Sequence, residues 1–396
     1  MIVPRMAYHT NPDLEAVSAP PISVVAQWRE KYAGSAPLLD LCQAVPDYPP
    51  APPLIDYLTK VIQQPETARY TPDEGLEQVR ESVVAAYAHK YQASLSPQHL
   101  CLTCGASAAF WLAITSLCRA GDEVILQNPC YFDHPMALQA LNIHIRYAEN
   151  QPGQPGVPSP ASIQQLITPR TRAILLVTPS NPTGVTISRE LLKSYFEIAQ
   201  SHTIALILDE TYSDFLYGAP HDLFQQENWD QTLIHIMSFG KTLALTGFRA
   251  GALIAAPHTI QLGLKVQDTM TVCQPRITQL AVQYGLDTLG DWIAQQREGI
   301  QRRHDRFCEI FTHPQNKFTI TASGNFFAWV RHPYQQYDSY QACQHLAEQF
   351  GILSLPGAAF GPGNEQYIRL ALGNSAIEQL PEVADRFIRA SQTLIH

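Results

Sequence analysis

Four polar side chains stand at or just after the ends of three short apolar runs, and their types suit covalent and acid–base chemistry. They are Lys241, Asp209 with Tyr212, and Asn181, which lies between two prolines. A lysine amine can act as a nucleophile, and a carboxylate can hold a cationic nitrogen. Taken alone, Lys241 is typical of a surface lysine. If the runs are neighbouring parallel strands, however, all four groups meet at the sheet edge where ligands bind in open α/β folds.

The elements that would position these side chains are apolar runs separated by helical patterns. Runs that are apolar on both faces are typical of strands in a covered sheet. Helical patterns lie at Ala106–Arg119, Phe132–Leu141 and Ser188–Ser201, so strand and helix alternate and a mainly parallel α/β sheet is predicted. The predicted strands are Asp122–Gln127, Arg172–Thr178, Thr203–Asp209, Leu233–Ser238 and Ala250–Ala255.

The regular alternation of strand and helix patterns ends after Arg276, which predicts a second, α+β unit. An amphipathic stretch runs from about residue 279 to Phe311 and is broken near Gly290. We expect an N-terminal arm with part of a small domain at 1–50, a large domain at 51–285 and a small C-terminal domain at 286–396. The other predicted elements are a helix at Ile22–Tyr32, a strand pattern at Phe318–Val330, a helix at Ser339–Phe350, strands at Ile352–Leu355 and Tyr367–Leu372, and a helix at Glu378–Leu394.

Composition favours a cytoplasmic protein that acts on small molecules. The 396 residues carry a formal net charge of −9, and their Lys and Arg residues form no basic stripe for nucleic acid or an anionic membrane. No apolar run approaches the ~18 residues of a membrane span, and Met1–Tyr8 lacks the apolar core of a secretory signal. Eight cysteines without a pairing rhythm predict reduced thiols, and the close pair Cys101 and Cys104 is interpreted as packing at a strand end.

Ten short motifs, taken in order, resemble those of the class I/II aminotransferases, which are pyridoxal-phosphate enzymes of fold type I. The resemblance spans nearly the whole chain. It implies a mostly parallel seven-stranded sheet with one antiparallel strand, a small α+β domain, and a homodimer with its active sites at the interface. The motifs are Pro46-Asp47, Tyr70-Thr-Pro-Asp-Glu-Gly75, Gly105-Ala-Ser107, Asn128-Pro-Cys-Tyr131, Asn181-Pro-Thr-Gly184, Asp209-Glu-Thr-Tyr212, Ser238-Phe-Gly-Lys241, Gly247-Phe-Arg249, Pro356-Gly-Ala-Ala-Phe-Gly361 and Tyr367-Ile-Arg369.

The resemblance implies a role for each of the four polar side chains. Lys241 would form the Schiff base with the cofactor aldehyde and then move a proton from the substrate Cα. Asp209 would hold the protonated pyridine nitrogen, which keeps the ring an electron sink. Asn181 and Tyr212 would donate hydrogen bonds to the phenolic oxygen. The competing interpretations are turn residues for Asp209 and Asn181 and a core aromatic for Tyr212.

The same resemblance implies a phosphate site at the start of a helix. Gly105, Ala106 and Ser107 open this helix, whose first N–H groups and dipole favour an anion. Ser238 and Arg249 would add oxygen contacts, Arg249 through its forked and permanently charged guanidinium. An ordinary helix cap is the alternative for the first three residues.

Three further residues match family positions that contact the cofactor ring, the phosphate in the neighbouring subunit, and the substrate. Tyr131 matches the aromatic residue that stacks on the cofactor ring, with core packing as the alternative. Tyr70 matches a residue that reaches the phosphate from the neighbouring subunit. Arg369 matches the arginine that binds the α-carboxylate of the substrate. A surface salt bridge is the alternative, and it is disfavoured because Ile368 and Leu370 alternate with Arg369 on a strand that we expect to be half-buried.

Four departures from the family pattern bear on the substrate. Ser107 stands where some dicarboxylate-specific members carry a lysine, which makes aspartate specificity doubtful. Arg276 either binds an anion near the dimer seam or is a surface arginine. His134 either touches substrate or is a loop histidine. The aromatic residues after Asn325 either line a pocket or fill the core of the small domain.

The resemblance therefore predicts a pyridoxal-phosphate aminotransferase that moves the amino group of an amino acid to a 2-oxo acid. The alternative is a fold-type-I enzyme that performs elimination, cyclisation or decarboxylation on an amino acid with the same catalytic groups. A cofactor-binding regulator fused to a DNA-binding module is a third reading. It would need a basic helix-turn-helix extension, whereas the residues before Asp40 resemble the N-terminal arm of the family.

Overall fold

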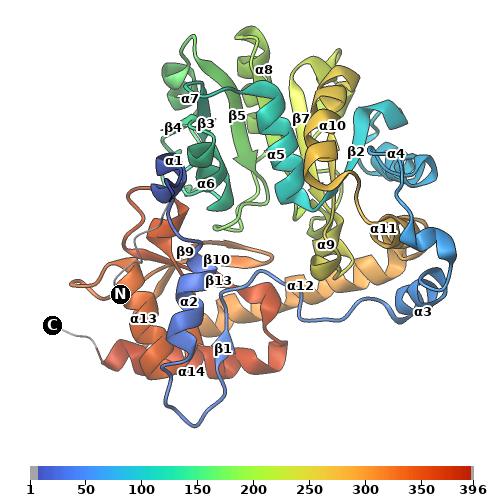
Figure 1. Cartoon of the computed structure of the whole chain (residues 1–396). Helices are drawn as coiled ribbons and strands as arrows, with labels where there is room; N and C mark the ends of the chain where they lie inside the picture. Colours follow the sequence, from blue (N-terminus) through green and yellow to red (C-terminus); the bar gives the residue numbers. More distant parts are fainter. Residues whose placement is uncertain (1–7, 394–396) are drawn as a thin grey trace.

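The computed structural model describes residues 8–393 and is built on two groups of strands (Figure 1). The larger group is a seven-stranded sheet in the order β2-β8-β7-β6-β5-β3-β4. Strand β8 runs antiparallel to both neighbours, and the other pairs are parallel, which confirms the predicted sheet. The strands are β2 (Leu100–Cys104), β3 (Glu123–Leu126), β4 (His144–Tyr147), β5 (Thr171–Val177), β6 (Ala205–Asp209), β7 (Leu233–Ser238) and β8 (Ala250–Ile254).

Helices cover both faces of this sheet, which explains why its strands are apolar on both sides. One face packs against α5 (Ala106–Leu117), α6 (Asp133–Ala140) and α10 (Pro257–Thr271). The other packs against α3 (Pro52–Val61), α4 (Glu77–Tyr91), α7 (Pro160–Leu166), α8 (Arg189–Ser201) and α11 (Arg276–Thr288). Because consecutive strand residues point to opposite faces, Asp209 lies on the α5 side and Glu210 points to the α4 side.

A second unit, which we call the small domain, is built on a four-stranded antiparallel sheet in the order β12-β13-β10-β9. Its strands are β9 (Thr319–Gly324), β10 (Phe327–Arg331), β12 (Leu355–Pro356) and β13 (Tyr367–Ala371). They pack with α12 (Gly290–Phe311), α13 (Ser339–Phe350) and α14 (Leu380–Gln392) around one apolar cluster.

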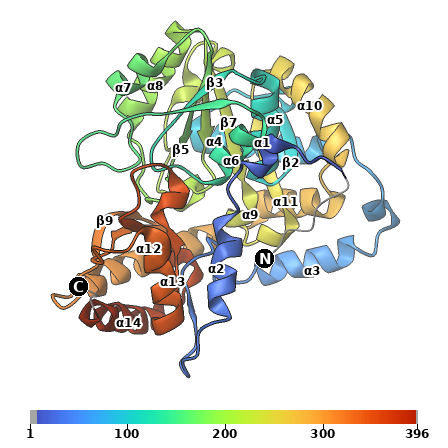
Figure 2. The ribbon, with the colours of Figure 1, turned by 60° about the vertical axis from the view of Figure 1, so that its left-hand side comes forward.

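Residues from the start of the chain pack into this second unit. Strand β1 (Leu39–Asp40) pairs in parallel with β11 (Ile352–Leu353). Helix α2 (Pro21–Arg29) lies beside α13 in both views, and Trp28 contacts Tyr340 edge to face (Figures 1 and 2). The short helix α1 (Pro12–Glu15) lies against α6 of the large sheet. The N-terminal part of the chain therefore contacts both groups of strands.

Several predicted elements need small corrections. The strand pattern at 318–330 is a hairpin of β9 and β10, because Asn325 adopts a left-handed conformation (φ 45°) and turns the chain. The last helix begins at Leu380, and its predicted end at Leu394 lies outside the described residues. Strand β4 was missed because it is an edge strand with half-exposed residues and no apolar run. The break near Gly290 is confirmed, since α11 ends at Thr288 and α12 begins at Gly290.

The cysteines agree with a further expectation. All eight cysteines are free thiols, and Cys101 and Cys104 belong to β2, as packing at a strand end predicts. In the stretch from residue 8 to residue 393, none of the helices combines the length and the apolar character that crossing a membrane requires.

Candidate active site

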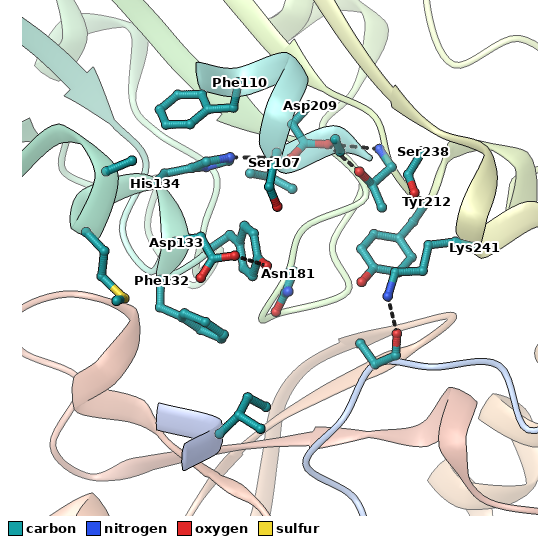
Figure 3. Close-up of a pocket in the computed structure, with 18 of the residues that line it drawn as sticks. Ser107, Phe110, Phe132, Asp133, His134, Asn181, Asp209, Tyr212, Ser238 and Lys241 are labelled. Carbon is teal, nitrogen blue, oxygen red and sulfur yellow. Dashed lines mark hydrogen bonds and ion pairs between the residues drawn. The ribbon is translucent and has the colours of Figure 1, made fainter. Parts of the chain in front are cut away.

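A cavity of about 540 Å³ opens at the carboxyl ends of β5, β6 and β7, between the two groups of strands (Figure 3). Its volume lies in the range of sites for small molecules and cofactors. Residues 42–45 close it from the side of the N-terminal segment. Of the side chains predicted for the site, those that line it are Ala106, Ser107, Tyr131, Asn181, Asp209, Tyr212, Ser238, Lys241, Arg249 and Arg369.

Lys241 lies in the short helix α9 (Phe239–Thr242), directly after β7. Its Nζ donates a hydrogen bond to the backbone carbonyl of Ala44. Burial, together with the positive charges of Arg369 and Arg249, lowers the pKa of Lys241 from 10.5 to about 8, although Asp209 acts in the opposite direction. The amine is therefore neutral far more often near pH 8 than that of a surface lysine, which is what a nucleophile needs.

Asp209 ends β6 with its carboxylate buried and fixed in place. Oδ1 accepts hydrogen bonds from the backbone N–H of Thr211 at 3.1 Å and from its hydroxyl at 2.7 Å. Oδ2 lies 3.5 Å from Nε2 of His134. His134 is itself buried on α6, against the rings of Phe110 and Tyr131, and its Nδ1 has no hydrogen-bond partner among the described residues. His134 is therefore not a loop histidine, because it lies on α6. Its Nε2 faces the carboxylate of Asp209.

Arg369 and Asn181 meet across the two groups of strands. Nη1 of Arg369 donates to Oδ1 of Asn181 at 3.1 Å, and Nη2 donates to the carbonyl of Cys42. The guanidinium is only 2% exposed and lies against the rings of Phe327 and Phe360. Its Nε has no hydrogen-bond partner in the described part of the chain, and no carboxylate there forms an ion pair with it. A buried guanidinium without an acid is prepared to bind one.

Two tyrosines flank these groups. Tyr212 lies between the cavity and the rings of Phe326 and Phe327, and burial raises the pKa of its hydroxyl. Tyr131 donates its hydroxyl hydrogen to Oδ2 of Asp133, at the first residue of α6. Burial, reinforced by Asp133, raises the pKa of Tyr131 well above its usual value. Both phenols therefore stay protonated at neutral pH and can donate hydrogen bonds.

The start of α5 forms a cradle for an anion. Gly105, which has φ 85°, precedes the helix, and the first backbone bond of the helix joins the N–H of Ala109 to the carbonyl of Gly105. The earlier amides are left free, as at any helix start. A Cβ on Gly105 would lie 2.5 Å from Nη2 of Arg249, so the guanidinium fills the space that a side chain would need. Ser238 ends β7 at the same side of the cavity.

Three predicted residues lie elsewhere. Tyr70 is 78% exposed and does not line the cavity of its own chain. Arg276 donates to the backbone carbonyl of Tyr70 at 3.3 Å and is also away from the cavity. Asn325 turns the β9–β10 hairpin, and the aromatic residues Phe326 and Phe327 after it pack in a small apolar cluster behind Tyr212. Of the two alternatives for these aromatics, core packing is correct.

Comparison with known proteins identifies the family. A family model described as aminotransferase class I and II matches residues 36–387. The chain belongs to this family. It is 26% identical over 382 residues to an aromatic aminotransferase of Arabidopsis thaliana, with 94% of each chain covered. It is 27% identical over 356 residues to an aspartate aminotransferase of Thermotoga maritima, covering 88% of this chain and 90% of the relative.

Solved structures agree with the fold. A mutant aspartate aminotransferase of Thermus thermophilus aligns with a TM-score of 0.88 at 23% identity, over 96% of this chain and 99% of that one. The aminotransferase is therefore an α/β protein of fold type I, as the motifs implied. Like the other members of its family, it uses pyridoxal phosphate to transfer the amino group of an amino acid to a 2-oxo acid.

The residues of the cavity fit this cofactor. Pyridoxal phosphate presents a ring nitrogen, a phenolic oxygen, an aldehyde and a phosphate. The cavity of the aminotransferase offers a buried carboxylate in Asp209, two neutral hydrogen-bonding side chains in Asn181 and Tyr212, and a partly neutral amine in Lys241. The free amides of α5 and the guanidinium of Arg249 provide an anion cradle. Each group of the cofactor thus has a chemically matched partner.

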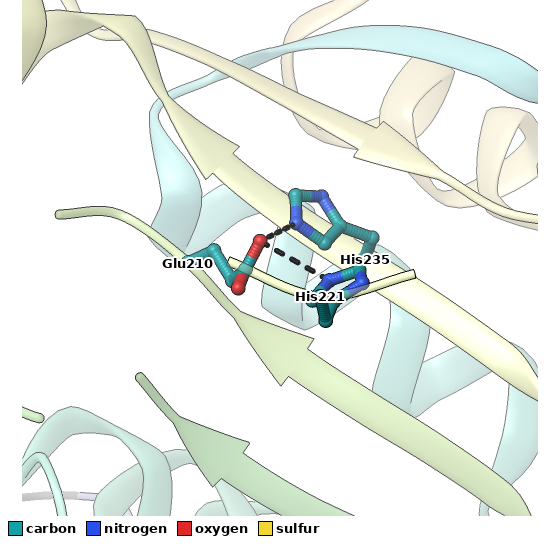
Figure 4. A group of neighbouring side chains, drawn as sticks. All are labelled: Glu210, His221 and His235. Carbon is teal, nitrogen blue, oxygen red and sulfur yellow. Dashed lines mark hydrogen bonds and ion pairs between the residues drawn. The ribbon is translucent and has the colours of Figure 1, made fainter. Parts of the chain in front are cut away.

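The aminotransferase also contains a buried polar cluster behind Asp209, which the sequence did not reveal. Glu210 points to the α4 side of the sheet, where its Oε2 accepts hydrogen bonds from Tyr91 at 2.6 Å and from Nε2 of His235 at 2.7 Å (Figure 4). Nε2 of His221 lies 3.4 Å from the same oxygen. Burial alone would raise the pKa of Glu210, but His221 and His235 hold it well below its usual range.

Hydrogen bonds also decide what this cluster holds. Two histidines and a carboxylate within 4.8 Å of one another can bind a metal ion. However, the backbone N–H of Leu223 donates to Nδ1 of His221 at 3.2 Å, which places the imidazole proton on Nε2, facing Glu210. The Nε2 proton of His221 therefore occupies the position that a metal ion would need. The Glu210 carboxylate and its neighbours connect the end of β6, strand β7 and the loop that carries His221.

We expect the Glu210→Ala substitution to lower the free energy of unfolding by about 3–5 kcal/mol, because it leaves His235 and Tyr91 buried without their shared acceptor and removes the carboxylate beside His221. Urea denaturation followed by circular dichroism measures this change. Glu197→Ala, at an exposed glutamate on α8, is the matched control and should change stability by less than about 0.5 kcal/mol. Equal stabilities of the two variants would contradict the assignment of Glu210.

Proposed function

We propose that Lys241 binds the aldehyde carbon of pyridoxal phosphate, Asp209 binds the pyridine nitrogen, and Asn181 and Tyr212 contact the phenolic oxygen. The observation that carries this proposal is one cavity holding both a lysine with a lowered pKa and a buried carboxylate fixed by two hydrogen bonds. His134, 3.5 Å from Asp209, supports the orientation of that carboxylate. Tyr131 lines the cavity and is proposed to lie on the face of the ring.

Lys241 has two tasks in this proposal. When bound, the cofactor supplies an electron sink for the bonds of the substrate Cα. The amine of Lys241 first holds the cofactor in place. Once the amino acid has displaced it, Nζ takes the proton from the substrate Cα, which is possible because its lowered pKa leaves it neutral near pH 8. The carbonyl of Ala44, which accepts from Nζ, keeps the amine near the cavity.

Arg369 is proposed to bind the α-carboxylate of the amino acid. Its buried position and its Nε without a partner in the described chain support this role. The Nη1 bond to Asn181 connects this residue to the proposed cofactor site. A guanidinium can take a carboxylate with two parallel hydrogen bonds, which fixes the orientation of the Cα–H bond toward Lys241.

The phosphate is proposed to lie at the start of α5, against Gly105, Ala106, Ser107, Ser238 and Arg249. We expect Gly105→Ala to weaken pyridoxal phosphate binding about 10- to 100-fold, because a charged hydrogen bond contributes about 1.5–3 kcal/mol and the new Cβ must push the flexible Arg249 guanidinium aside. Titration of the cofactor-free protein with pyridoxal phosphate, followed by its visible absorption, gives the dissociation constant.

Gly121→Ala is a closely matched control for this prediction. Gly121 has the same φ of 85° as Gly105, but a Cβ there would meet nothing within 4 Å. Both variants place an alanine at the same positive φ, but only Gly105→Ala also presses a Cβ against Arg249, so Gly105→Ala should lose more cofactor affinity. Equal affinities in the two variants would place the phosphate elsewhere.

Assembly and location complete the proposal. We propose a homodimer in which Tyr70 contacts the cofactor phosphate of the neighbouring subunit. Its 78% exposure within its own chain supports this role. We propose the domain division 1–50, 51–285 and 286–396, which the pairing of β1 with β11 supports for the N-terminal part. Eight free cysteines support a cytoplasmic location.

Transfer of a labelled amino group tests the proposed function. The purified enzyme is incubated with a ¹⁵N-labelled amino acid and an unlabelled 2-oxo acid, and the products are examined by mass spectrometry. We expect ¹⁵N in the amino acid that derives from the 2-oxo acid. Release of the label as ammonia would instead indicate elimination, and loss of CO₂ with retention of the label in an amine would indicate decarboxylation.

A further inference from the structure

The cavity extends beyond the residues proposed to hold the cofactor, into a part whose wall is apolar. This part is contributed by the segment that follows α1, by α2 and α5, and by α6 with the residue before it. Figure 3 places Phe132 and Asp133 across the cavity from Lys241. We call this apolar part of the cavity the apolar lobe. The side chains that form it are Val17, Ile22, Trp111, Phe132, Met136 and Ala140.

The apolar lobe is built from well-packed elements. Phe132 is buried against the ring of Phe360, and Ile22 and Met136 pack against the same small-domain cluster. Trp111 packs against the cluster on the other side, under α5. The wall is therefore a formed surface, and burying an apolar substrate side chain against it removes apolar area from water on both partners.

The positive charges that line the cavity are all engaged at its other groups. They are Lys241, Arg249 and Arg369, which are proposed to bind the cofactor aldehyde, its phosphate and the substrate α-carboxylate. Within residues 8–393, no further Lys or Arg lines the cavity. A second carboxylate on the substrate would lose its hydration in the apolar lobe without gaining a cation from this chain.

A carboxylate lies beside the apolar lobe, and its negative charge is opposite to the positive charge that would bind an acidic side chain. Asp133 lines the cavity at the first residue of α6, next to Phe132 in the chain. One of its oxygens, Oδ2, accepts the hydroxyl hydrogen of Tyr131, which holds the carboxylate in place. An acidic side chain in the lobe would face this like charge, whereas an apolar one would not.

We propose that the amino acid and 2-oxo acid substrates carry apolar side chains, aliphatic or aromatic, and that Asp133 excludes acidic ones. This inference rests on the aminotransferase function and on the residue roles proposed above. It assigns the apolar lobe to the substrate side chain and makes Asp133 a determinant of specificity that does not take part in the chemistry. Several relatives are named for aspartate, so the inference separates this chain from them in substrate class.

The first test compares four donors. The holoenzyme is mixed with leucine, phenylalanine, aspartate or glutamate without an acceptor, and the rate of 2-oxo acid release is measured as a function of donor concentration. We expect the second-order rate constant, taken from the slope of rate against donor concentration at low concentration, to be at least 10-fold higher for leucine or phenylalanine than for either acidic donor. Equal or faster reaction of aspartate or glutamate would overturn the inference and leave the proposed function intact. No 2-oxo acid from any donor would overturn both.

The second test concerns Asp133 itself. Asp133→Asn keeps an oxygen for the Tyr131 hydroxyl and removes the charge, so the fold has no reason to change. We expect the variant to shift the aspartate-to-leucine ratio about 10-fold toward aspartate. Asp305→Asn, at a side chain that is 66% exposed on α12, is the control and should leave this ratio unchanged. An unchanged ratio in Asp133→Asn would overturn the role of Asp133.

Discussion

Lys241→Ala is expected to lower kcat by at least about 10³- to 10⁴-fold, the largest effect of any single substitution in this enzyme. The substitution removes both the amine that holds the cofactor and the base that takes the Cα proton, and general acid–base catalysis alone contributes about 10²- to 10⁴-fold. Steady-state assay with a saturating amino donor and 2-oxo acid measures the loss. Lys193→Ala, at an exposed lysine on α8, is the control and should retain wild-type kcat.

The lowered pKa of Lys241 adds a pH signature to this prediction. Only the neutral amine attacks the aldehyde, and its pKa of about 8 lies below the ordinary 10.5. The rate of recombination of cofactor-free enzyme with pyridoxal phosphate should therefore rise about 10-fold per pH unit below pH 8 and level off above it. A rate that still rises steeply between pH 9 and 10 would contradict the burial of this amine. A Lys241→Ala variant with wild-type kcat would contradict its catalytic role outright.

Arg369→Lys is expected to lower kcat/KM for amino acids on the order of 10²-fold, mainly through KM. Lysine keeps the positive charge but cannot make two parallel hydrogen bonds to a carboxylate, and a disrupted buried charge contact costs about 2–5 kcal/mol. The decisive comparison is leucine against 3-methylbutylamine, which is leucine without its carboxylate. The variant should lose activity toward leucine and keep the low activity toward the amine.

Arg331→Lys supplies the control for this comparison. Arg331 is exposed on β10, which pairs with the strand of Arg369, so the substitution tests the same sheet without touching the cavity. Wild-type kinetics are expected for it. Parallel losses toward leucine and the amine in Arg369→Lys would mean that Arg369 acts by supporting Asn181 and the fold, and that another group binds the α-carboxylate.

The positions of the central residues could be predicted because they depend on local sequence and on one topological rule. Lys241, Asp209 and Asn181 each follow a continuous apolar run, and parallel neighbouring strands must end at one edge. Arg369 was predicted from the family motif Tyr367-Ile-Arg369. Its strand β13 pairs with β10 and β12 and is buried on both faces, so the expected half-buried strand is wrong. For Lys241, Asp209 and Asn181, short-range pattern and long-range geometry agree.

Other parts of the site depend on packing that no local pattern encodes. His134 reaches Asp209 only because α6 packs on the sheet beside α5. The two residues are 75 positions apart in the chain, so only the packing of these elements brings them together. Glu210 directly follows β6 and His235 lies on the neighbouring strand β7, but His221 comes from a loop. The carbonyls of Cys42 and Ala44, which hold Arg369 and Lys241, belong to backbone that carries no residue-type signal.

The boundaries of several elements also could not be predicted from the sequence pattern. The hairpin of β9 and β10 gives a single strand pattern in the sequence, because its turn uses Asn325 in a left-handed conformation, which a non-glycine residue adopts only in a suitable context. The apolar lobe cannot be predicted from local pattern, because its side chains come from three helices and from the residues beside them, in separate parts of the chain. Each of these features is set by contacts between segments distant in sequence.

Borohydride reduction followed by peptide mapping tests the central claim most directly. The holoenzyme is treated with sodium borohydride, which makes the bond between a lysine and the cofactor permanent, and is then digested and analysed by mass spectrometry. We expect the added mass of the reduced cofactor on Lys241 and on no other lysine. A cofactor found on a different lysine, or enzyme that transfers amino groups while Lys241 remains unmodified, would contradict the assignment of this cavity as the active site.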